Sequence, residues 1–386
     1  MRLYWLWLAT RPGMTEREKM AVLLHFGSPE DCYYADAAVF SGVENLSKSA
    51  FEALCDKNLQ EAESIAAACE KKKIHILTFG DEAYPSMLRN IIDPPLVLYY
   101  RGVLPDFDRE LAIGIVGTRK ASAYGLSTAR KLGGQIAAHG GLVVSGMAEG
   151  IDAMATWGAL DAGETAVGIL GNGVDRVYPQ CNRDLYRKME QKGCLISEYP
   201  PGTAPDRWNF PKRNRIISGL SCGVLVVEAP QKSGALITAR QALEQGRDVF
   251  VVPGNIGIST CEGSNALLKD GAALVTSGWD VVGEYAASYP DKIQKEIPPA
   301  RQADDKIVVD NAMPPLYSDL ENIAADLSDS ERAILAAIGT GEQLIDTVIA
   351  KTGLSSQDVL AALTMLEVSG FVTTRPGGWV QTSQIH

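Results

Sequence analysis

Several features that define common functional classes are missing from this 386-residue chain. No apolar run approaches the roughly 20 residues that a membrane-spanning helix needs. The apolar patch Leu3–Ala9 ends close to Arg11 and lacks a signal-peptide cleavage pattern, so we expect a buried first helix there. The 7 cysteines contain no C-x-x-C pair and the 4 histidines are scattered. This composition argues against a disulfide framework or a metal site and fits a reduced, cytoplasmic environment.

The common nucleotide-binding motifs are also absent. The first strand of the central region is followed by Gly117-T-R-K-A-S-A-Y-Gly125, which is not the G-x-G-x-x-G pattern of dinucleotide-binding proteins. The chain has no G-x-x-x-x-G-K-[ST] loop for ATP hydrolysis either. We therefore expect no nicotinamide cofactor and no P-loop, and no other cofactor is indicated.

Catalytic residues are hard to find. No histidine lies in the loops that follow the predicted strands, so no Ser-His or Cys-His arrangement is evident. Glu149, Asp152, Glu198 and Glu228 lie near those loops, but such carboxylates usually cap helices or pair with arginines. Asp152 lies where a helix begins, which suits a cap. The sequence favours a protein that is not an enzyme.

The net charge of −11 is unevenly distributed. Residues 1–110 hold 12 basic and 17 acidic side chains, and residues 286–386 hold 7 and 14. The middle, residues 111–285, holds 17 and 16. Acidity is therefore concentrated in the flanks, and an anion-binding site is expected in the centre.

The central region predicts an α/β fold with a doubly wound, Rossmann-like parallel sheet. Short apolar runs rich in strand-forming residues alternate with helical stretches, as in βαβ units. The predicted strands are Leu111–Val116, Leu142–Val144, Thr165–Leu170, Cys194–Ser197, Gly223–Val227, Asp248–Val252 and Ala272–Val275. The intervening helices include Tyr124–His139, Asn182–Lys192 and Ala235–Gln245.

The flanks predict three further regions. Residues 1–70 are expected to form a helical domain of the SAM or helix-hairpin-helix kind. Residues 71–285 are expected to form an extended Rossmann-like domain, in which the prolines of 74–102 interrupt helices. Residues 286–325 are proline-rich and predict a linker. In 326–386, Ser328 with Glu331 forms a capping box, helices are expected over about 342–351 and from Ser355 to Val368, and a hairpin over 371–380 follows. That order is typical of a winged helix.

Glycine and small polar residues are concentrated in the loops at the carboxyl ends of the predicted strands. Parallel sheets bind ligands at that edge, where helix N-termini and free N–H groups point. The loops are Gly117–Lys120, Ser145–Gly150, Gly171–Gly173, Lys232–Gly234 and Pro253–Asn255. One such loop is weak evidence, but five at one edge favour a phosphate-rich ligand.

The strongest local signal is the segment 207–215, Arg-Trp-Asn-Phe-Pro-Lys-Arg-Asn-Arg. It contains Arg207, Lys212, Arg213 and Arg215 without an acidic residue, and Trp208 and Phe210 are interleaved among them. Cations that neutralise phosphates beside rings that stack on bases are typical of single-stranded nucleic-acid binding. Taken alone, the segment also fits a helix N-terminus with solvated basic side chains.

These motifs together resemble the DNA-processing protein A family, also called DprA or Smf. The carrying motifs are Ser145-G-M-A-E-G-I-D-A-M-A155, Phe210-P-K-R-N-R-I-I-S218, Val226-V-E-A229, Ser233-G-A-L-I-T-A239 and Val252-P-G254, in the family's order. The resemblance covers about residues 75–285. Thr156 and Trp157 follow Ala155, where family members commonly have a histidine.

The resemblance implies a protein that binds single-stranded DNA, protects it and helps to load RecA during DNA uptake and natural transformation. It further implies a homodimer formed through the Rossmann-like domain, with single-strand-binding protein as a further partner. By position, the family's DNA pocket maps to the cations Arg119, Lys212 and Arg215. The remaining expected contacts are Arg213, Ser145, Gly146, Phe210, Asn214, Ser233, Gly234, Gly117 and Thr118.

Two other functions remain open at this point. Phosphoribohydrolases share the superfamily, but the segment Ser233–Glu244 lacks their paired glutamates after the glycine turn. A transcription regulator could act through the winged helix, although Ser355–Val368 has no basic residue and the hairpin contributes only Arg375.

Overall fold

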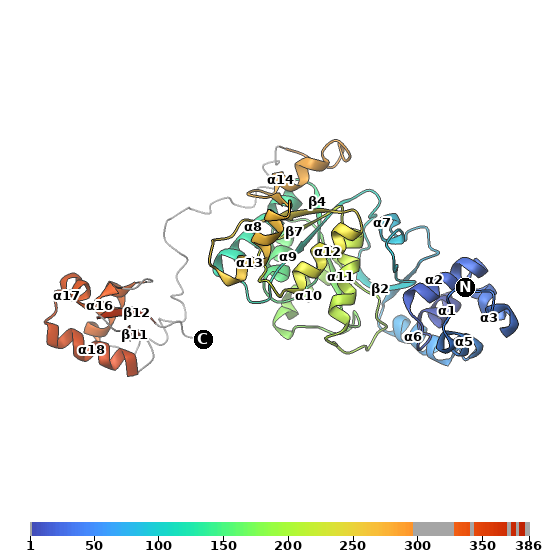
Figure 1. Cartoon of the computed structure of the whole chain (residues 1–386), viewed down its shortest axis with the longest axis horizontal. Coiled ribbons are helices and arrows are strands. Elements are labelled where there is room, and N and C mark those ends of the chain that lie inside the picture. Colours follow the sequence, from blue (N-terminus) through green and yellow to red (C-terminus); the bar gives the residue numbers. More distant parts are fainter. Residues whose placement is uncertain (1, 296–327, 340–342, 369–371, 376–377, 383–386) are drawn as a thin grey trace. The chain divides into compact units, whose positions relative to one another are not determined.

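The computed structural model describes residues 2–295, 328–339, 343–368, 372–375 and 378–382. They fall into two compact units, one within residues 1–304 and one within 305–386 (Figure 1). Most of the predicted linker, residues 296–325, lies outside the described residues. No helix in the described part of the chain is long and apolar enough to span a membrane.

A nine-stranded sheet forms the centre of the first unit. Its strands lie in the order β1-β2-β6-β5-β4-β3-β7-β8-β9, and those from β6 to β9 in this order are parallel. These seven are β3 (Leu111–Val116), β4 (Gly141–Ser145), β5 (Ala166–Leu170), β6 (Cys194–Ser197), β7 (Gly223–Val226), β8 (Asp248–Val251) and β9 (Ala273–Leu274). The seven predicted strands are thus confirmed.

Two further strands were not predicted. β1 (His75–Thr78) pairs antiparallel with β2 (Val97–Gly102), and β2 pairs antiparallel with β6. The prolines of the segment 74–102 lie between these two strands, where they leave the hydrogen bonds of the ladder intact. The sheet therefore extends beyond the parallel part.

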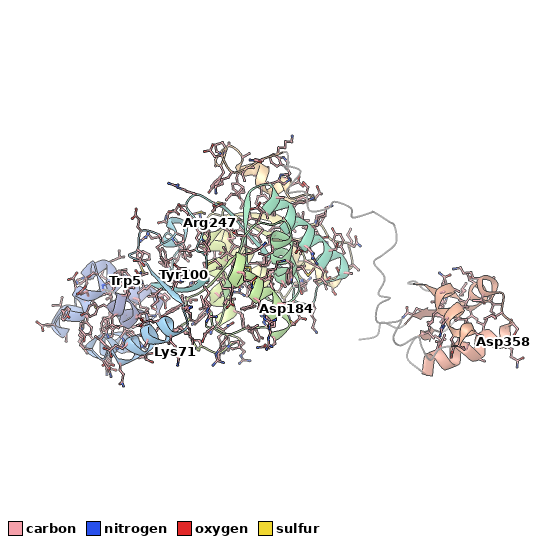
Figure 2. The ribbon with its side chains drawn as sticks, turned by 180° about the vertical axis from the view of Figure 1, so that it is seen from behind. Trp5, Lys71, Tyr100, Asp184, Arg247 and Asp358 are labelled. Atoms are coloured by element: carbon pink, nitrogen blue, oxygen red, sulfur yellow. The ribbon has the colours of Figure 1, made fainter. Side chains whose placement is uncertain are left out.

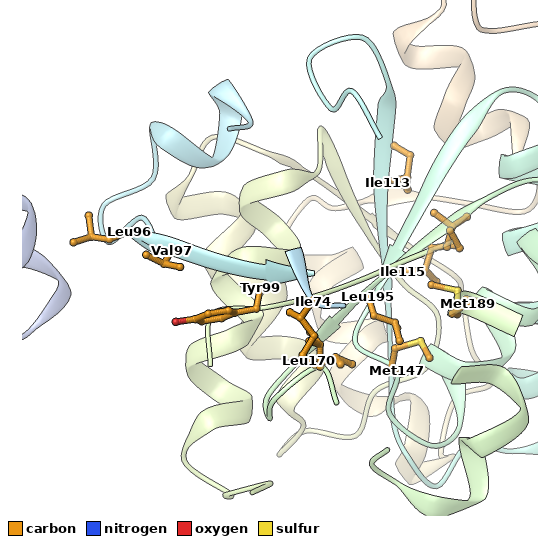
Figure 3. Close-up of a cluster of buried hydrophobic side chains, with 14 of the residues drawn as sticks. Ile74, Leu96, Val97, Tyr99, Ile113, Ile115, Met147, Leu170, Met189 and Leu195 are labelled. Atoms are coloured by element: carbon orange, nitrogen blue, oxygen red, sulfur yellow. The ribbon is translucent and has the colours of Figure 1, made fainter. Parts of the chain in front are cut away.

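Helices cover both faces of the sheet, because alternate side chains of each strand point to opposite sides. Ile113 and Ile115 of β3 belong to one core with α8 (Ala123–Ala138), α9 (Ile151–Asp161) and α10 (Arg183–Lys192). Figure 3 shows part of this core, with Ile113, Ile115, Met147 and Leu170 labelled. Ala112 and Val116 belong to the opposite core, with α11 (Asn209–Leu220) and α12 (Gly234–Glu244). This is the doubly wound arrangement that the sequence predicted.

The N-terminal helices share the first of these cores. They are α1 (Arg2–Ala9), α2 (Glu16–Phe26), α3 (Pro29–Tyr34), α4 (Ala37–Phe40), α5 (Lys48–Cys55) and α6 (Gln60–Lys71). The expected buried first helix is confirmed, since Leu6, Trp7 and Leu8 are fully buried. The core runs through Ile74 and Tyr99 onto the sheet, and Figure 2 shows Trp5 and Tyr100 in this part of the unit. The predicted domain boundary at residue 70 is thus bridged by shared packing.

The remaining elements of this unit are short. They are α7 (Ser86–Arg89), α13 (Glu262–Lys269), α14 (Trp279–Val282) and 3₁₀ turns at Gln180–Asn182, Ser259–Cys261 and Gly283–Tyr285. Residues 286–295, expected to begin the linker, still pack on the unit. Ile293 is buried, and the Gln294 amide donates to the His139 carbonyl at 3.2 Å.

The second unit has the predicted winged-helix order. It contains α16 (Asp329–Ile338), α17 (Ile345–Thr352), α18 (Ser356–Val368) and a sheet of β10 (Gln343–Leu344), β12 (Trp379–Thr382) and β11 (Val372–Arg375). The Ser328–Glu331 capping box is confirmed. The second helix begins three residues later than expected, because Gln343 and Leu344 pair with Val380 and Trp379 as a strand.

Glycine allows the close packing of α8 on α9. A Cβ on Gly158 would lie 2.0 Å from the Arg130 carbonyl oxygen, and one on Gly134 would lie 3.2 Å from the Gly158 carbonyl oxygen. Of these two, only the Gly158 distance is shorter than the contacts that real Cβ atoms make. The Arg130 carbonyl belongs to the backbone of α8, so it cannot move aside as a flexible side chain could. Gly133 is packed as closely, since a Cβ there would lie 2.3 Å from the Ala155 carbonyl oxygen, so the two helices can pack in this register only because both positions are glycine.

We expect Gly158→Ala to destabilise the first unit by about 2 kcal/mol, because overpacking a close contact costs about 1–3 kcal/mol. Gly134→Ala is the matched control, in which the gain in helix propensity of up to about 1 kcal/mol offsets a milder contact. Urea unfolding followed by circular dichroism measures both. Equal midpoints for the two variants would contradict the role assigned to Gly158.

Candidate nucleic-acid interface

A pocket lies at the carboxyl edge of the parallel sheet, where the loops after β3, β4 and β5 meet. It is lined by Arg119, Gly146, Ala148, Glu149, Leu170, Gly171, Asn172, Tyr178, Pro179 and Phe210. Three sequence-predicted residues, Arg119, Gly146 and Phe210, therefore meet in one site. They come from the β3 loop, the β4 loop and the first turn of α11.

An arginine and two rings form one wall of this pocket. The guanidinium carbon of the exposed Arg119 lies 5.1 Å from the ring centroid of Phe210. The Phe210 ring lies 5.4 Å from that of Tyr178, at an interplanar angle of 34°. A Cβ on Gly171 would lie 2.9 Å from the Phe210 ring, so glycine lets the ring pack on the β5 loop. A positive charge beside partly exposed aromatic faces can hold a phosphate and stack on a base.

Two buried charges hold the loops of the pocket from below. Arg213 is 3% exposed, and its Nη1 donates to the carbonyl oxygens of Gly146 (2.6 Å) and Ile169. Burial raises the pKa of the Asp152 carboxyl, and this is opposed by the charge of Arg213 and by the backbone N–H groups of Ala148 and Gly117. A Cβ on Gly146 would lie 2.4 Å from both Arg213 and Asp152. The two side chains thus hold the loops after β3 and β4 and the end of strand β5, and only glycine fits between them at position 146.

This position differs from the two roles that the sequence suggested. Arg213 was expected among the DNA contacts, but it faces the protein interior and bonds to carbonyl oxygens. Asp152 was expected to cap α9, but Gly150 occupies the cap position and makes no side-chain cap bond. Both side chains shape the pocket without being exposed to a ligand. Their spacing in the sequence gives no sign of this, because the pairing joins α9 to α11.

Arg215 also differs in part from its expected role. It forms an ion pair with Glu198 through two bonds, at 2.6 Å and 3.0 Å, and donates to the Asp93 carbonyl at 3.0 Å. Burial alone would lower the pKa of Arg215, but the Glu198 carboxylate outweighs it and raises the pKa. The charge of Arg215 is therefore already balanced by the protein. Glu198 has the arginine-paired structural role that is usual for such carboxylates.

The other predicted residues fall into an exposed and a structural group. Lys212 and Gly234 are exposed, and no described carboxylate lies within ion-pairing distance of Lys212. Ser233 is partly exposed and caps α12 by accepting from the Ala235 N–H. The structural group makes internal bonds or contacts: Ser145 donates to Ile115, Asn214 to Gly234, the Thr118 amide to Glu228, and Gly117 packs against Ile151.

Glu228 also has a structural role, at the loop after β3. Its buried carboxylate accepts from the Ser122 N–H at 3.0 Å, from the Ser122 hydroxyl at 3.1 Å and from the Thr260 hydroxyl. It therefore joins the start of α8 to the turn before α13. This leaves Glu149 as an exposed carboxylate of the pocket.

Sequence reasoning missed Tyr178 and Asn182. The side-chain amide of Asn182 donates to the carbonyl oxygens of Met147 (3.0 Å) and Ala148 (3.2 Å), which supports the β4 loop. Both residues lie in the connection between β5 and α10, where the sequence has no motif to single them out. Only the fold brings this connection onto the pocket.

Comparison with known proteins agrees with this architecture. The profile of the family described as DNA recombination-mediator protein A matches residues 75–286, and that of the DprA winged helix domain matches 319–378. Protein Smf of Synechocystis is 33% identical over 97% of this chain and 97% of its own length. DNA processing protein DprA of Bacillus subtilis is 41% identical over 57% of this chain and 74% of its own.

Solved structures extend the likeness. The X-ray structure of DNA processing protein A from Streptococcus pneumoniae superposes with a TM-score of 0.65 at 32% identity, covering 74% of this chain and 98% of that one. DNA processing protein A from Helicobacter pylori, whose structure was reported for its single-stranded DNA binding mode, gives 0.51 at 29%, covering 56% and 97%. The fold and site define a DNA-recombination protein with a Rossmann-like centre and a winged helix. The chain belongs to the DNA recombination-mediator protein A (DprA/Smf) family.

The buried charges give a direct test of how the pocket is held. We expect Asp152→Asn to destabilise the first unit by about 2 kcal/mol, because the buried carboxyl accepts from the N–H groups of Ala148 and Gly117 and leaving a buried donor unsatisfied costs about 1–3 kcal/mol. The amide replaces one acceptor oxygen of the carboxyl by an NH2 donor, which cannot accept from a backbone N–H. Glu149→Gln is the matched control, since Glu149 is exposed and only three positions away. Thermal unfolding of both variants at neutral pH measures the difference, and an Asp152→Asn midpoint equal to that of the control would refute it.

Proposed function

We propose that this protein binds single-stranded DNA at the carboxyl edge of its sheet. The observation that carries the proposal is the exposed Arg119 guanidinium stacked on Phe210, above a pocket with glycine backbone at 146 and 171. Lys212, two residues after Phe210 on α11, adds a second exposed cation. Charge supplies affinity for phosphates, and flat side chains accept any base. The binding mode named for the Helicobacter relative supports this proposal.

We infer that the site binds DNA and does not turn nucleotides over. Three of the four carboxylates near the edge are engaged in structural contacts, Asp152 with loop amides, Glu198 with Arg215 and Glu228 with Ser122 and Thr260. General acid–base chemistry needs positioned groups within reach of the substrate. A phosphoribohydrolase would release free base from nucleoside monophosphates, and we expect none.

In the cell, the proposed role is to protect incoming single-stranded DNA and to assist RecA loading during DNA uptake and natural transformation. RecA and single-strand-binding protein are the proposed partners. Family membership supports this role, since the family is described as a recombination mediator. Nuclease protection of a bound oligonucleotide and the rate of RecA filament assembly on it would test the two parts separately.

We also propose a homodimer formed through the Rossmann-like domain. The last strand in the sheet order, β9, leaves Leu274 56% exposed. Leu274 pairs with Val251, and the loop that follows β8 carries Ile256, which is 99% exposed. Large exposed apolar side chains near an open sheet edge favour association with a second copy. Analytical ultracentrifugation of Leu274→Lys against the unchanged protein tests this.

Binding should depend on salt and on Lys212. If about four phosphates are neutralised, log affinity for an oligonucleotide should fall against log salt with a slope of about −3. Lys212→Ala should weaken binding of all base sequences alike, because phosphate contacts carry no sequence information. Lys48→Ala is the matched control, since Lys48 is exposed and lies on α5. Fluorescence anisotropy measures both, and a salt-independent affinity or an unaffected Lys212→Glu variant would rule out the site.

The winged helix is not expected to anchor the protein to DNA. Residues 326–386 carry three basic and seven acidic side chains, and this charge repels a polyanion over about a Debye length. The unit has its own buried core, formed by Ile334, Val348, Leu363 and their neighbours, so it can be examined alone. We propose a protein-contact or regulatory role for it.

Truncation separates this role from that of a transcription regulator. Residues 1–298 should keep most of the single-strand affinity, whereas the fragment 326–386 should bind neither single- nor double-stranded DNA at physiological salt. Electrophoretic mobility shifts with matched oligonucleotides measure both. A shift of duplex DNA by the fragment alone would favour the regulator.

A further inference from the structure

A second hollow opens on the other side of Tyr178. Its lining includes two arginines, Arg176 and Arg183, together with Tyr178, Gln180, Asp175 and Pro205. Tyr178 also lines the first pocket, so the two hollows share one wall. Arg183 is the first residue of α10, and its neighbour Asp184 is labelled at the surface in Figure 2. Neither arginine belongs to the motifs that carry the family resemblance.

The charges in this hollow leave a surplus of cations. Its one carboxylate, Asp175, is bonded to Lys72 at 2.5 Å and to the Gly202 N–H at 2.8 Å. Burial alone would raise the pKa of Asp175, but Lys72 and this N–H lower it. Arg176 is exposed and has no ion pair with a described carboxylate. Arg183 donates only to the neutral side chain of Gln180, at 3.1 Å. The two guanidinium groups are therefore available to an anion.

Tyr178 makes the second hollow continuous with the first. Along the wall, the order is the Arg119 guanidinium, the Phe210 ring 5.1 Å from it, and the Tyr178 ring 5.4 Å further on. Arg176 and Arg183 line the second hollow together with Tyr178, and neither lines the first. Cations on both sides of a pair of aromatic rings suit a single strand, whose phosphates and bases both need partners.

We propose that the second hollow is a further subsite for the same single strand. Arg176 and Arg183 hold phosphates of nucleotides beyond those held at Arg119 and Lys212, and Tyr178 stacks between the two groups. This inference rests on the proposed function of the first pocket. Its ligand is an extended polynucleotide, because the strand has to occupy both hollows to meet Arg119 and the two arginines together.

Affinity as a function of oligonucleotide length provides the test. The unchanged protein and the Arg176→Ala/Arg183→Ala variant are titrated with oligothymidylates of about 4 to 16 nucleotides, the usual range of site sizes. We expect equal affinity for the shortest bound oligomers and about a tenfold loss in the variant for the longest. Two fewer phosphate contacts should also make the salt slope shallower by about 1.4, at about 0.7 per phosphate.

The control variant is Arg109→Ala/Arg187→Ala, which removes the same charge. Both of these arginines are exposed and paired with a nearby aspartate, and neither lines the first pocket or the second hollow. If binding depends on Lys212 but the two double variants agree at every length, the second subsite is refuted and the first pocket stands. If the unchanged protein binds no oligomer, the proposed function itself fails. Matching thermal midpoints for the two variants show that any loss reflects binding.

Discussion

The pocket depends on two buried side chains, Asp152 of α9 and Arg213 of α11, that bind the backbone of its loops. Asp152 takes the backbone N–H groups of Gly117 and Ala148, and Arg213 donates to the carbonyl oxygens of Gly146 and Ile169. The loops after β3 and β4 and the end of β5 are thereby held by two buried side chains. In a low-dielectric interior such a pair is costly to form and costly to break, so its geometry is sharply defined. Because these loops are rigid, the exposed residues of the pocket can bind a flexible ligand without a loss of loop entropy on binding.

The cations of the site differ in how deeply they are buried. Arg213 is buried and donates to backbone carbonyl oxygens. The charge of Arg215 is neutralised by Glu198, and Arg119 and Lys212 are exposed at the surface. A basic run in the sequence therefore contains cations of three kinds. Within the segment 207–215, Arg213 is buried, Arg215 is paired with Glu198 and Lys212 is exposed, and only the tertiary contacts separate these roles.

Much of the fold could be predicted from the sequence, because apolar strands alternate with helices and a strand buried on both faces is apolar throughout. The antiparallel pair β1 and β2 could not, because prolines between the strands outweighed two short apolar runs. For the site, Arg119, Gly146 and Phe210 could be predicted from glycine-rich loops and the basic segment. The roles of Arg213, Asp152 and Tyr178 could not, since each depends on a contact between elements distant in the chain.

The shared core of the N-terminal helices and the sheet affects how this protein can be divided. Ile74 and Tyr99 belong to the same cluster as Trp7 and Leu54 on one side and Leu195 on the other. The predicted domain boundary at residue 70 therefore does not coincide with a break in the hydrophobic core. Cutting the chain there would expose apolar surface on both fragments. The fragment that retains the pocket would have a newly exposed apolar surface next to β2. Shortened forms that start after the helices would then associate through a surface that the intact chain never exposes.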